Sequence, residues 1–145
     1  MALETVIKIV RDSILPRRGM KKSLIAVYLF GSLARGTERA KSDIDLAFVF
    51  DEKFYKEDSF RALQETELFS AEVSKRMCTP VDAVILNGSS LSFAYHAVRE
   101  GVCIYERDSA DRILYEVALD NKYQDFIPFI NELREKKRSV LVGRD

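Results

Sequence analysis

Hydrophobic positions recur at two different spacings along this chain, and the spacing changes from one segment to the next. Residues 3–15 carry apolar side chains at helical intervals, and Pro16 with Gly19 marks the end of that predicted helix. Ser23–Phe30 and Asp43–Phe50 are instead short apolar runs bounded by charged residues or glycine, which is typical of buried strands. The pattern therefore predicts one helix followed by two strands.

The rest of the chain continues this alternation. The polar stretch between the two strands, residues 31–42, is long enough for one short helix beginning at Ser32. Beyond the second strand, the same criteria predict a charged helical region over 51–77, a strand over 80–86, a helix over 91–100, a strand over 102–105 and a helix over 109–138. This order of elements predicts a small α/β or α+β domain.

The last predicted helix carries apolar residues, a proline and a basic end. Pro128 cannot donate a backbone hydrogen bond, so it is expected to kink or restart the helix. Phe126 and Phe129 are expected in the core; if exposed, they form an apolar patch that marks a partner surface. The basic run Arg134–Arg138 is either a solvated helix end or a contact with an acidic or RNA-binding partner. The expected buried positions are Ile113, Leu114, Val117, Phe126, Ile127, Ile130 and Leu133.

Composition and charge narrow the functional classes. The chain has 145 residues, and 23 Lys and Arg balance 23 Asp and Glu, so its formal net charge is zero. This length suits one domain with a substantial core. The lack of excess positive charge argues against a protein that holds DNA or RNA by bulk electrostatics. No apolar run approaches the length of about 18 residues that a membrane span needs, so no membrane association is expected.

The cysteines and the single histidine carry no predicted chemistry. Cys78 and Cys103 show neither a CxxC spacing nor a nearby His, so packed free thiols in a reducing cytosol are expected. His96 is expected to be a surface or partly buried helix residue, because the chain has no second His to share a metal. The charged N-terminal helix does not resemble a signal peptide, and these features together predict a cytoplasmic protein.

Two carboxylates stand out at the start of the second predicted strand. Asp43 and Asp45 are separated by one residue, so both side chains leave the same face of the strand. Two like charges held side by side repel unless a cation neutralises them. Converging carboxylate oxygens suit a hard cation such as Mg²⁺, which proteins commonly hold with one or two carboxylates and substrate phosphates.

A phosphate-binding turn is predicted at the end of the first strand. Gly31 allows the backbone to approach a ligand closely, and Ser32 can cap the following helix and donate to a phosphate. Arg35 lies one turn into that helix, and its guanidinium suits phosphate oxygens. A phosphate-binding turn that faces a metal site is typical of enzymes that catalyse phosphoryl or nucleotidyl transfer.

A third carboxylate completes the predicted site. Asp82 lies inside the apolar third strand, where a charged residue is costly unless it is paired or bound to metal. If this strand pairs beside the second, Asp82 faces the same cleft as Asp43 and Asp45. Three carboxylates can bridge a pair of metal ions.

These residues resemble a known family. Gly31-Ser32, ten intervening residues and Asp43-Ile44-Asp45 match the GS-x10-DxD signature of the DNA polymerase β-like nucleotidyltransferase superfamily. The fuller string GSLARGTERAKSDIDL is similar to the form found in minimal nucleotidyltransferases (MNT), the antitoxin halves of HEPN–MNT toxin–antitoxin pairs. The later segments VDAVILN, AYHAVREGVCIYERD and YQDFIPFINELR also resemble that family, so the similarity covers nearly the whole chain.

The resemblance implies a fold and a set of site residues. It implies a single nucleotidyltransferase domain over residues 1–138, with a mixed sheet of about four strands flanked by helices, and a flexible tail over residues 139–145. The family motif assigns catalytic and metal-binding roles to Asp43, Asp45 and Asp82, with Asp82 as a ligand or general base. It assigns nucleotide binding to Gly31 and Ser32, with Arg35 and Ser42 as further nucleotide-binding residues.

The resemblance also implies an activity. Proteins of this kind use ATP, with Mg²⁺ (two ions are expected), to attach AMP to a tyrosine of the partner HEPN ribonuclease toxin. The expected complex is hetero-oligomeric, and no direct nucleic-acid binding is expected.

Two other functions stay open. One is a binding module that neutralises a toxin only by covering it, although steric inhibition needs none of the catalytic residues that the motif retains. The other is a transferase that modifies a small molecule such as an antibiotic.

Overall fold

A computed structural model gives the fold for residues 2–31, 34 and 43–142. Its centre is a four-stranded sheet in the order β3-β2-β1-β4. The strand β1 pairs antiparallel with both β2 and β4, whereas β2 pairs parallel with β3. The sheet is therefore mixed, as expected. The strands are β1 (Leu24–Phe30), β2 (Ile44–Phe50), β3 (Val81–Ile85) and β4 (Val102–Glu106).

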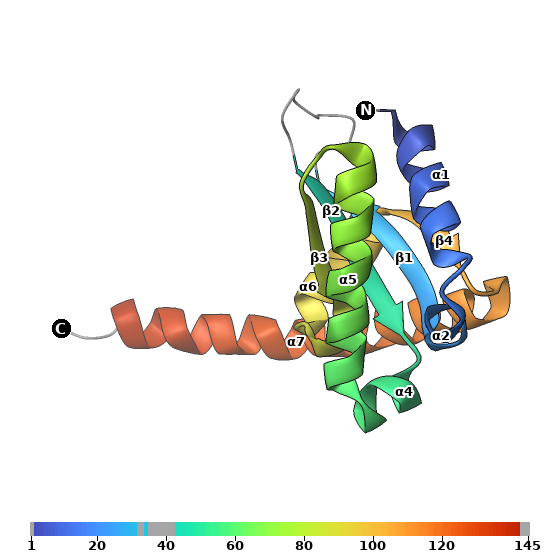
Figure 1. Ribbon diagram of the computed structural model, residues 1–145. Helices are drawn as coiled ribbons and strands as arrows, with labels where there is room; N and C mark the ends of the chain where they lie inside the picture. Colours follow the sequence, from blue (N-terminus) through green and yellow to red (C-terminus); the bar gives the residue numbers. More distant parts are fainter. Residues whose placement is uncertain (1, 32–33, 35–42, 143–145) are drawn as a thin grey trace.

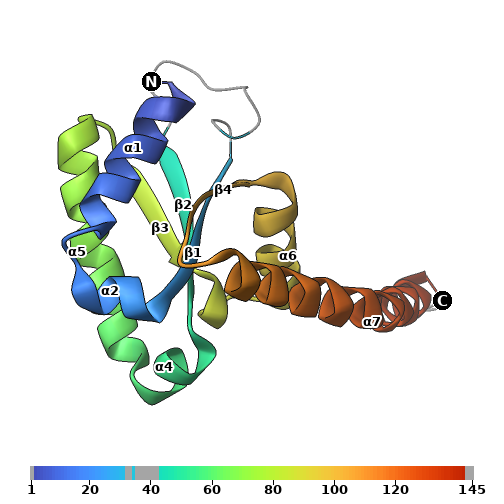
Figure 2. The same ribbon diagram turned by 90° about the vertical axis from the view of Figure 1, so that its right-hand side faces the viewer.

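One face of the sheet is covered by α1 (Leu3–Ile14) and α5 (Ser59–Met77), as Figures 1 and 2 show. Alternate residues of β2 point into this layer, because successive side chains of a strand leave opposite faces. They pack there with apolar side chains of the two helices in one continuous core. The fully buried members include Val6, Val10, Ile14, Leu46, Phe48 and Phe69.

The opposite face is covered by α6 (Leu91–Glu100) and by the first part of α7 (Ser109–Val142). Its core is built from smaller residues, such as Ala26, Ala47 and Ala97. A buried tyrosine of β1, Tyr28, donates a hydrogen bond of 2.7 Å to Glu116 of α7, which fixes that helix to the sheet. Short elements complete the chain: α2 (Arg18–Ser23), α4 (Glu52–Glu57) and a 3₁₀ turn, η1 (Leu86–Gly88).

The helical region predicted over residues 51–77 is divided in two. The Asp51 side chain accepts a hydrogen bond from the Lys53 amide at the start of α4, and Asp58 accepts one from the Arg61 amide at the start of α5. Each aspartate caps a new helix, because a carboxylate satisfies amides that lack a partner within the helix. The α2 helix, which was not predicted, lies between Pro16 and the first strand.

The last helix differs most from its prediction. It continues through Pro128 without a restart and ends at Val142 rather than at Arg138. Several positions expected to be buried are exposed, including Ile113 (48%), Leu114 (68%), Val117 (52%) and Leu133 (49%), and Phe129 is 52% exposed. Phe126, Ile127 and Ile130 are half-buried, and the only buried residue of the described helix is Leu119. The prediction of a buried face was wrong because few residues of the described part of α7 are buried against α6 and the sheet, and its second half extends beyond them (Figure 1).

The remaining expectations concern single residues. His96 is an exposed helix residue, as expected, and its ring lies 3.3 Å from the Tyr123 hydroxyl. Both cysteines are free thiols, but Cys78 is exposed rather than packed, because it ends α5 in the left-handed conformation with φ 53°. Among the helices of the described residues, we find none with the length and apolar character of a membrane span.

Candidate functional site

The candidate site lies where β1 ends and where β2 and β3 begin. Because β1 and β2 are antiparallel, Phe30, the last residue of β1, lies opposite Asp45 near the start of β2. Because β2 and β3 are parallel, Asp45 is also in register with Asp82. A backbone hydrogen bond of 3.0 Å from the Ile44 amide to the Pro80 carbonyl ties the beginnings of these two strands together. We call this end of the sheet the acidic edge, defined by Asp43, Asp45 and Asp82.

The sheet geometry places the carboxylates on one face. Neighbours in register on adjacent strands project to the same side, so Asp45 and Asp82 share a face. That face also holds Ala47, which packs under α6, and it lies opposite the α1–α5 layer. Asp43 and Asp82 are exposed and Asp45 is half-buried. The sequence predicted that Asp82 faces the same cleft if its strand pairs beside β2. The structure shows this pairing.

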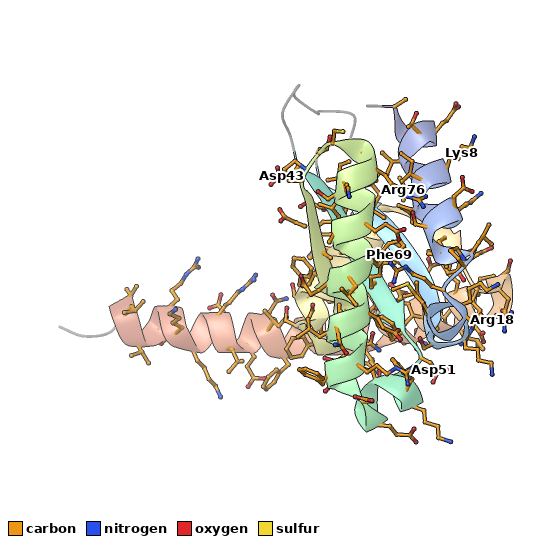
Figure 3. The ribbon with its side chains drawn as sticks, in the orientation of Figure 1. Lys8, Arg18, Asp43, Asp51, Phe69 and Arg76 are labelled. Carbon is orange, nitrogen blue, oxygen red and sulfur yellow. The ribbon has the colours of Figure 1, made fainter. Side chains whose placement is uncertain are left out.

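Figure 3 shows how the acidic edge relates to the rest of β2. Asp43 lies at the end of the sheet where β2 begins, and Asp51 lies at the other end of the same strand. A groove of about 560 Å³ opens beside Asp51, Asn87 and Arg107, and the acidic carboxylates do not line it. The candidate chemistry therefore lies at the other end of β2 from this groove.

Gly31 has a specific geometric reason to be glycine. Its φ is +80°, a conformation that residues with a Cβ rarely adopt. A Cβ atom built on Gly31 would lie 2.3 Å from the Asp45 Oδ2 atom, far inside van der Waals contact. The backbone of the turn thus lies directly against the Asp45 carboxylate. The sequence predicted a close backbone approach at this glycine, and the structure places it beside a predicted metal ligand.

The donor chemistry of the acidic edge fits magnesium. Carboxylate oxygens are the ligands this ion prefers, and Asp45 and Asp82 lie next to each other in the sheet. Within residues 2–31, 34 and 43–142, however, no three His, Cys, Asp or Glu side chains are arranged as a complete metal site. Mg²⁺ in proteins usually takes some of its ligands from water and substrate phosphates, so a magnesium role for these carboxylates stays a prediction.

Three predicted nucleotide-binding residues lie outside the part of the chain that the structure describes. They are Ser32, Arg35 and Ser42. Their roles stay predictions, as do the catalytic and metal-binding roles of the three aspartates.

One neighbour of the acidic edge was not found from the sequence. The Phe30 ring contacts Phe93 of α6 edge-to-face, with ring centroids 5.7 Å apart. Phe93 is 42% exposed, so a flat apolar surface lies one strand away from Asp45. The signal was weak, because Phe93 and Phe30 are 63 residues apart and nothing in either segment predicts their contact.

Several pKa shifts have clear physical causes and belong to residues that join α7 to the sheet. Burial raises the pKa of the Tyr28 phenol, and the hydrogen bond to Glu116 raises it further. Burial also raises the pKa of Tyr115. Where β4 leads into α7, the hydrogen bond from Arg112 of α7 lowers the pKa of Glu106 of β4. These groups join α7 to β1 and β4, so their shifts reflect how the helix is held.

Comparison with known proteins connects this arrangement to a family. The family model described as Polymerase beta, Nucleotidyltransferase matches residues 16–110, a range that contains the whole acidic edge. Among curated proteins, Protein adenylyltransferase MntA of Aphanizomenon flos-aquae (strain 2012/KM1/D3) is 33% identical over 98 residues. That match spans 64% of this chain and 65% of the length of the relative.

Solved structures show the same fold. A chain in a crystal structure of a toxin–antitoxin with AMP-PNP superposes with a TM-score of 0.61 and 23% identity, covering 90% of this chain and 97% of that chain. A chain in the structure of a tri-AMPylated Shewanella oneidensis HEPN toxin in complex with MNT antitoxin gives a TM-score of 0.55 and 21% identity, covering 90% and 94%. At these identities the similarity concerns the fold alone.

Proposed function

This chain belongs to the Polymerase beta, Nucleotidyltransferase family, and on that premise we propose that it is a protein adenylyltransferase that acts as an antitoxin. It transfers AMP from ATP to a tyrosine of a partner HEPN-family toxin and depends on Mg²⁺. The observation that carries the proposal is the register of Asp45 with Asp82, directly beside the Gly31 turn.

The relatives support the choice of reaction. The curated relative is a protein adenylyltransferase, and the structural neighbours are toxin–antitoxin complexes, one with AMP-PNP and one with an AMPylated HEPN toxin. An adenine nucleotide or AMP group appears in all three descriptions, and two of them, the protein adenylyltransferase and the AMPylated toxin, also name a protein acceptor. We carry both to this chain because it has the same fold and retains the acidic edge.

The proposed reaction is a displacement at the α-phosphorus of ATP. The phenol oxygen of the acceptor tyrosine forms a bond to the α-phosphorus. The bond from this phosphorus to the oxygen that bridges the α- and β-phosphates breaks, and diphosphate leaves. Magnesium held by Asp43 and Asp45 would neutralise phosphate charge and orient the α-phosphate for in-line attack. Asp82 either accepts the phenolic proton or completes the metal site, and in the second case that proton passes to solvent.

The residues around the carboxylates have supporting roles. Gly31 lets the chain turn against Asp45, so the amides that follow can approach the triphosphate closely. Ser32, Arg35 and Ser42 are proposed to donate hydrogen bonds to phosphate oxygens. The exposed Phe93 ring provides a surface on which the adenine can pack.

Mass spectrometry of the HEPN partner tests the proposal. The partner is incubated with this protein, ATP and Mg²⁺, and we expect one or more AMP units on a tyrosine. The Asp43→Ala/Asp45→Ala variant should add none. Asp12→Ala, which removes an exposed carboxylate from α1, is the matched control and should transfer AMP at the wild-type rate.

The alternative outcomes lead to different functions. A stable complex without AMP transfer would contradict the enzymatic proposal and favour an antitoxin that acts by steric binding. If neither a complex nor transfer is observed, small-molecule acceptors should be screened instead.

A further inference from the structure

The second half of α7 projects from the body of the protein. We call residues 126–142 the α7 arm; Figure 1 shows it extending beyond the sheet and the helices that cover it. Every residue from 131 to 142 is exposed. Large apolar side chains are among them, including Leu133 (49% exposed), Val140 (55%) and Leu141 (70%). In proteins, most of the stability of a helix comes from packing of an apolar face, so these exposed side chains are candidates for contact with a partner.

Four apolar residues of the arm, Phe126, Ile130, Leu133 and Val140, follow the spacing of a helix–helix contact. Steps of four and three residues alternate along one stripe of α7, which is the pattern of knobs-into-holes packing. We call this stripe the seam. Its members are Leu119, Tyr123, Phe126, Ile130, Leu133, Lys137 and Val140.

The seam begins inside the protein. Leu119 is 8% exposed and packs on the α6 side of the sheet. The Tyr123 ring stacks on Tyr95 of α6, with centroids 3.8 Å apart. The same stripe therefore packs against a helix of this chain at its start and continues, with the same spacing, into solvent. Its exposed part is a continuation of an existing helix–helix interface.

Charge on the arm distinguishes between possible occupants. Arg134 and Lys136 flank the seam, and Lys137 lies within it, whereas Glu132 and Glu135 lie on the outer part of the helix. Lys136 approaches Glu132 to 3.5 Å, but this pair is exposed on both sides and contributes little. The seam thus presents positive charge. Two copies of the arm would place these cations against each other, whereas a helix with acidic residues beside its apolar stripe would complement them.

We propose that the α7 arm is the docking surface for an acidic amphipathic helix of the partner protein. The inference rests on the proposed function in one respect, because the partner used to test it is the HEPN protein. The arm begins beyond residue 110, where the family match ends, and Figure 3 shows Asp43 near the top of the sheet and the arm leaving the body lower down. Docking and AMP transfer are therefore assigned to separate parts of the chain.

The test measures binding and transfer separately, with the full chain and the HEPN protein. In Leu133→Asp/Val140→Asp a charge replaces two exposed apolar side chains, so the fold should be kept, which thermal unfolding checks. We expect Kd for the partner to rise at least about thirtyfold, as for loss of an interface hot spot. The variant should show a raised KM for the partner in AMP transfer and an unchanged kcat.

Charge reversal tests the chemistry of the occupant. Arg134→Glu/Lys136→Glu should weaken binding about tenfold at low salt and remove most of the salt dependence seen with wild type. Glu135→Ala, on the outer face, is the matched control and should leave Kd unchanged.

The outcomes separate this inference from the proposed function. If wild type binds and modifies the partner while Leu133→Asp/Val140→Asp binds equally tightly, the docking surface is wrong and the enzymatic proposal stands. If wild type binds without transferring AMP and the arm variant loses binding, the docking surface stands and the enzymatic proposal fails. If the chain alone sediments as a dimer that Leu133→Asp dissociates, the occupant is a second copy and the inference is overturned.

Discussion

The two faces of the sheet differ in how completely the helices bury the side chains of β2. On the α1–α5 face, β2 contributes Leu46 and Phe48, which are fully buried under two helices. On the other face, the same strand contributes Asp45, Ala47 and Val49. The small residues lie under α6, and the carboxylate lies beyond it, half-buried at the edge. The strand β2 thus contributes buried core residues to the α1–α5 face and a candidate functional carboxylate to the opposite face.

This difference follows from the alternation of a strand. Residues that leave β2 on opposite faces experience different environments although they are neighbours in sequence. The closed face can use large apolar side chains, and their burial stabilises the fold. If the proposed function holds, the other face must leave room for a nucleotide and a protein acceptor. We therefore expect substitutions on the closed face to change stability and substitutions at the acidic edge to change activity.

The strongest test of this division is Phe69→Ala on α5. Phe69 is fully buried and contacts Phe48 edge-to-face, with ring centroids 5.7 Å apart. Removing the ring leaves a cavity in the closed core, so the free energy of unfolding should fall by about 3–5 kcal/mol. Denaturant titration measures this loss. AMP transfer per folded molecule, measured well below the unfolding transition, should stay near the wild-type value.

The matched control for this change is the adjacent Leu68→Ala. Leu68 is 59% exposed on the outer side of the same helix, so its loss should cost less than about 0.5 kcal/mol. A large fall in activity of folded Phe69→Ala would show that the two faces are coupled.

Gly31→Ala tests the acidic edge with a single methyl group. The new Cβ would meet the Asp45 Oδ2 atom at 2.3 Å, and the φ of +80° is unfavourable for alanine. The Asp45 carboxylate must shift, and a displacement of about 1 Å in a reacting site can lower the rate about a hundredfold. The stability cost should be smaller, about 1–2 kcal/mol for the strained backbone. Initial rates of AMP transfer and thermal unfolding measure the two effects.

Gly19→Ala is the corresponding control. This glycine lies inside α2, where an added Cβ would make only an ordinary contact of 3.5 Å with Glu65. Alanine should slightly stabilise the protein there, because it restricts the unfolded chain, and activity should not change. Equal activity of Gly31→Ala and wild type would remove Asp45 from the proposed mechanism.

The sequence was sufficient to predict the sheet and the location of the acidic edge. Short apolar runs identified the four strands, and α6 has the bounds that were expected, with the Ser90 side chain accepting a hydrogen bond from the Phe93 amide at its start. The motif spacing predicted that Gly31 and Asp45 belong to the same site. The antiparallel pairing of β1 with β2 places the two residues next to each other. These features are local or depend on one strand pairing, so a sequence pattern can reveal them.

The features that could not be predicted depend on which surfaces meet. Helical spacing identified Phe126, Ile130 and Leu133 as apolar positions of one helix, but it could not tell whether anything in the chain covers them, and Leu133 is 49% exposed. The contact of Phe30 with Phe93 likewise requires α6 to fold back over β1. The break between α4 and α5 at Asp58 was missed because it depends on one side chain, which caps α5 by accepting a hydrogen bond from the Arg61 amide. The surrounding sequence pattern is equally compatible with one continuous helix.

The smallest predicted effect concerns the bond that holds α7 on the more open face. Tyr28→Phe removes the hydrogen bond from the Tyr28 hydroxyl to Glu116, which should lower the free energy of unfolding by about 1 kcal/mol. Tyr95→Phe, on α6, removes a hydroxyl from a ring that stays stacked on Tyr123, and it should change stability by less than about 0.5 kcal/mol. AMP transfer should be unaffected in both variants, because neither residue belongs to the acidic edge.

The dependence of this effect on pH gives the sharper test. Burial and the bond to Glu116 raise the pKa of Tyr28 in the folded protein above its ordinary value of 10.0. Below pH 10 the phenol is protonated in both the folded and unfolded states, so its full contribution to stability is present. Above pH 10 the phenol of the unfolded state ionises before that of the folded state, so the free energy of unfolding of wild type falls as pH rises. Tyr28→Phe has no phenol at this position, so its stability does not fall for this reason. Denaturant titrations across this range should therefore show the gap between wild type and Tyr28→Phe narrowing as pH rises. A constant gap would mean that Tyr28 is not held in a buried, hydrogen-bonded state and that α7 is attached to the sheet by other contacts.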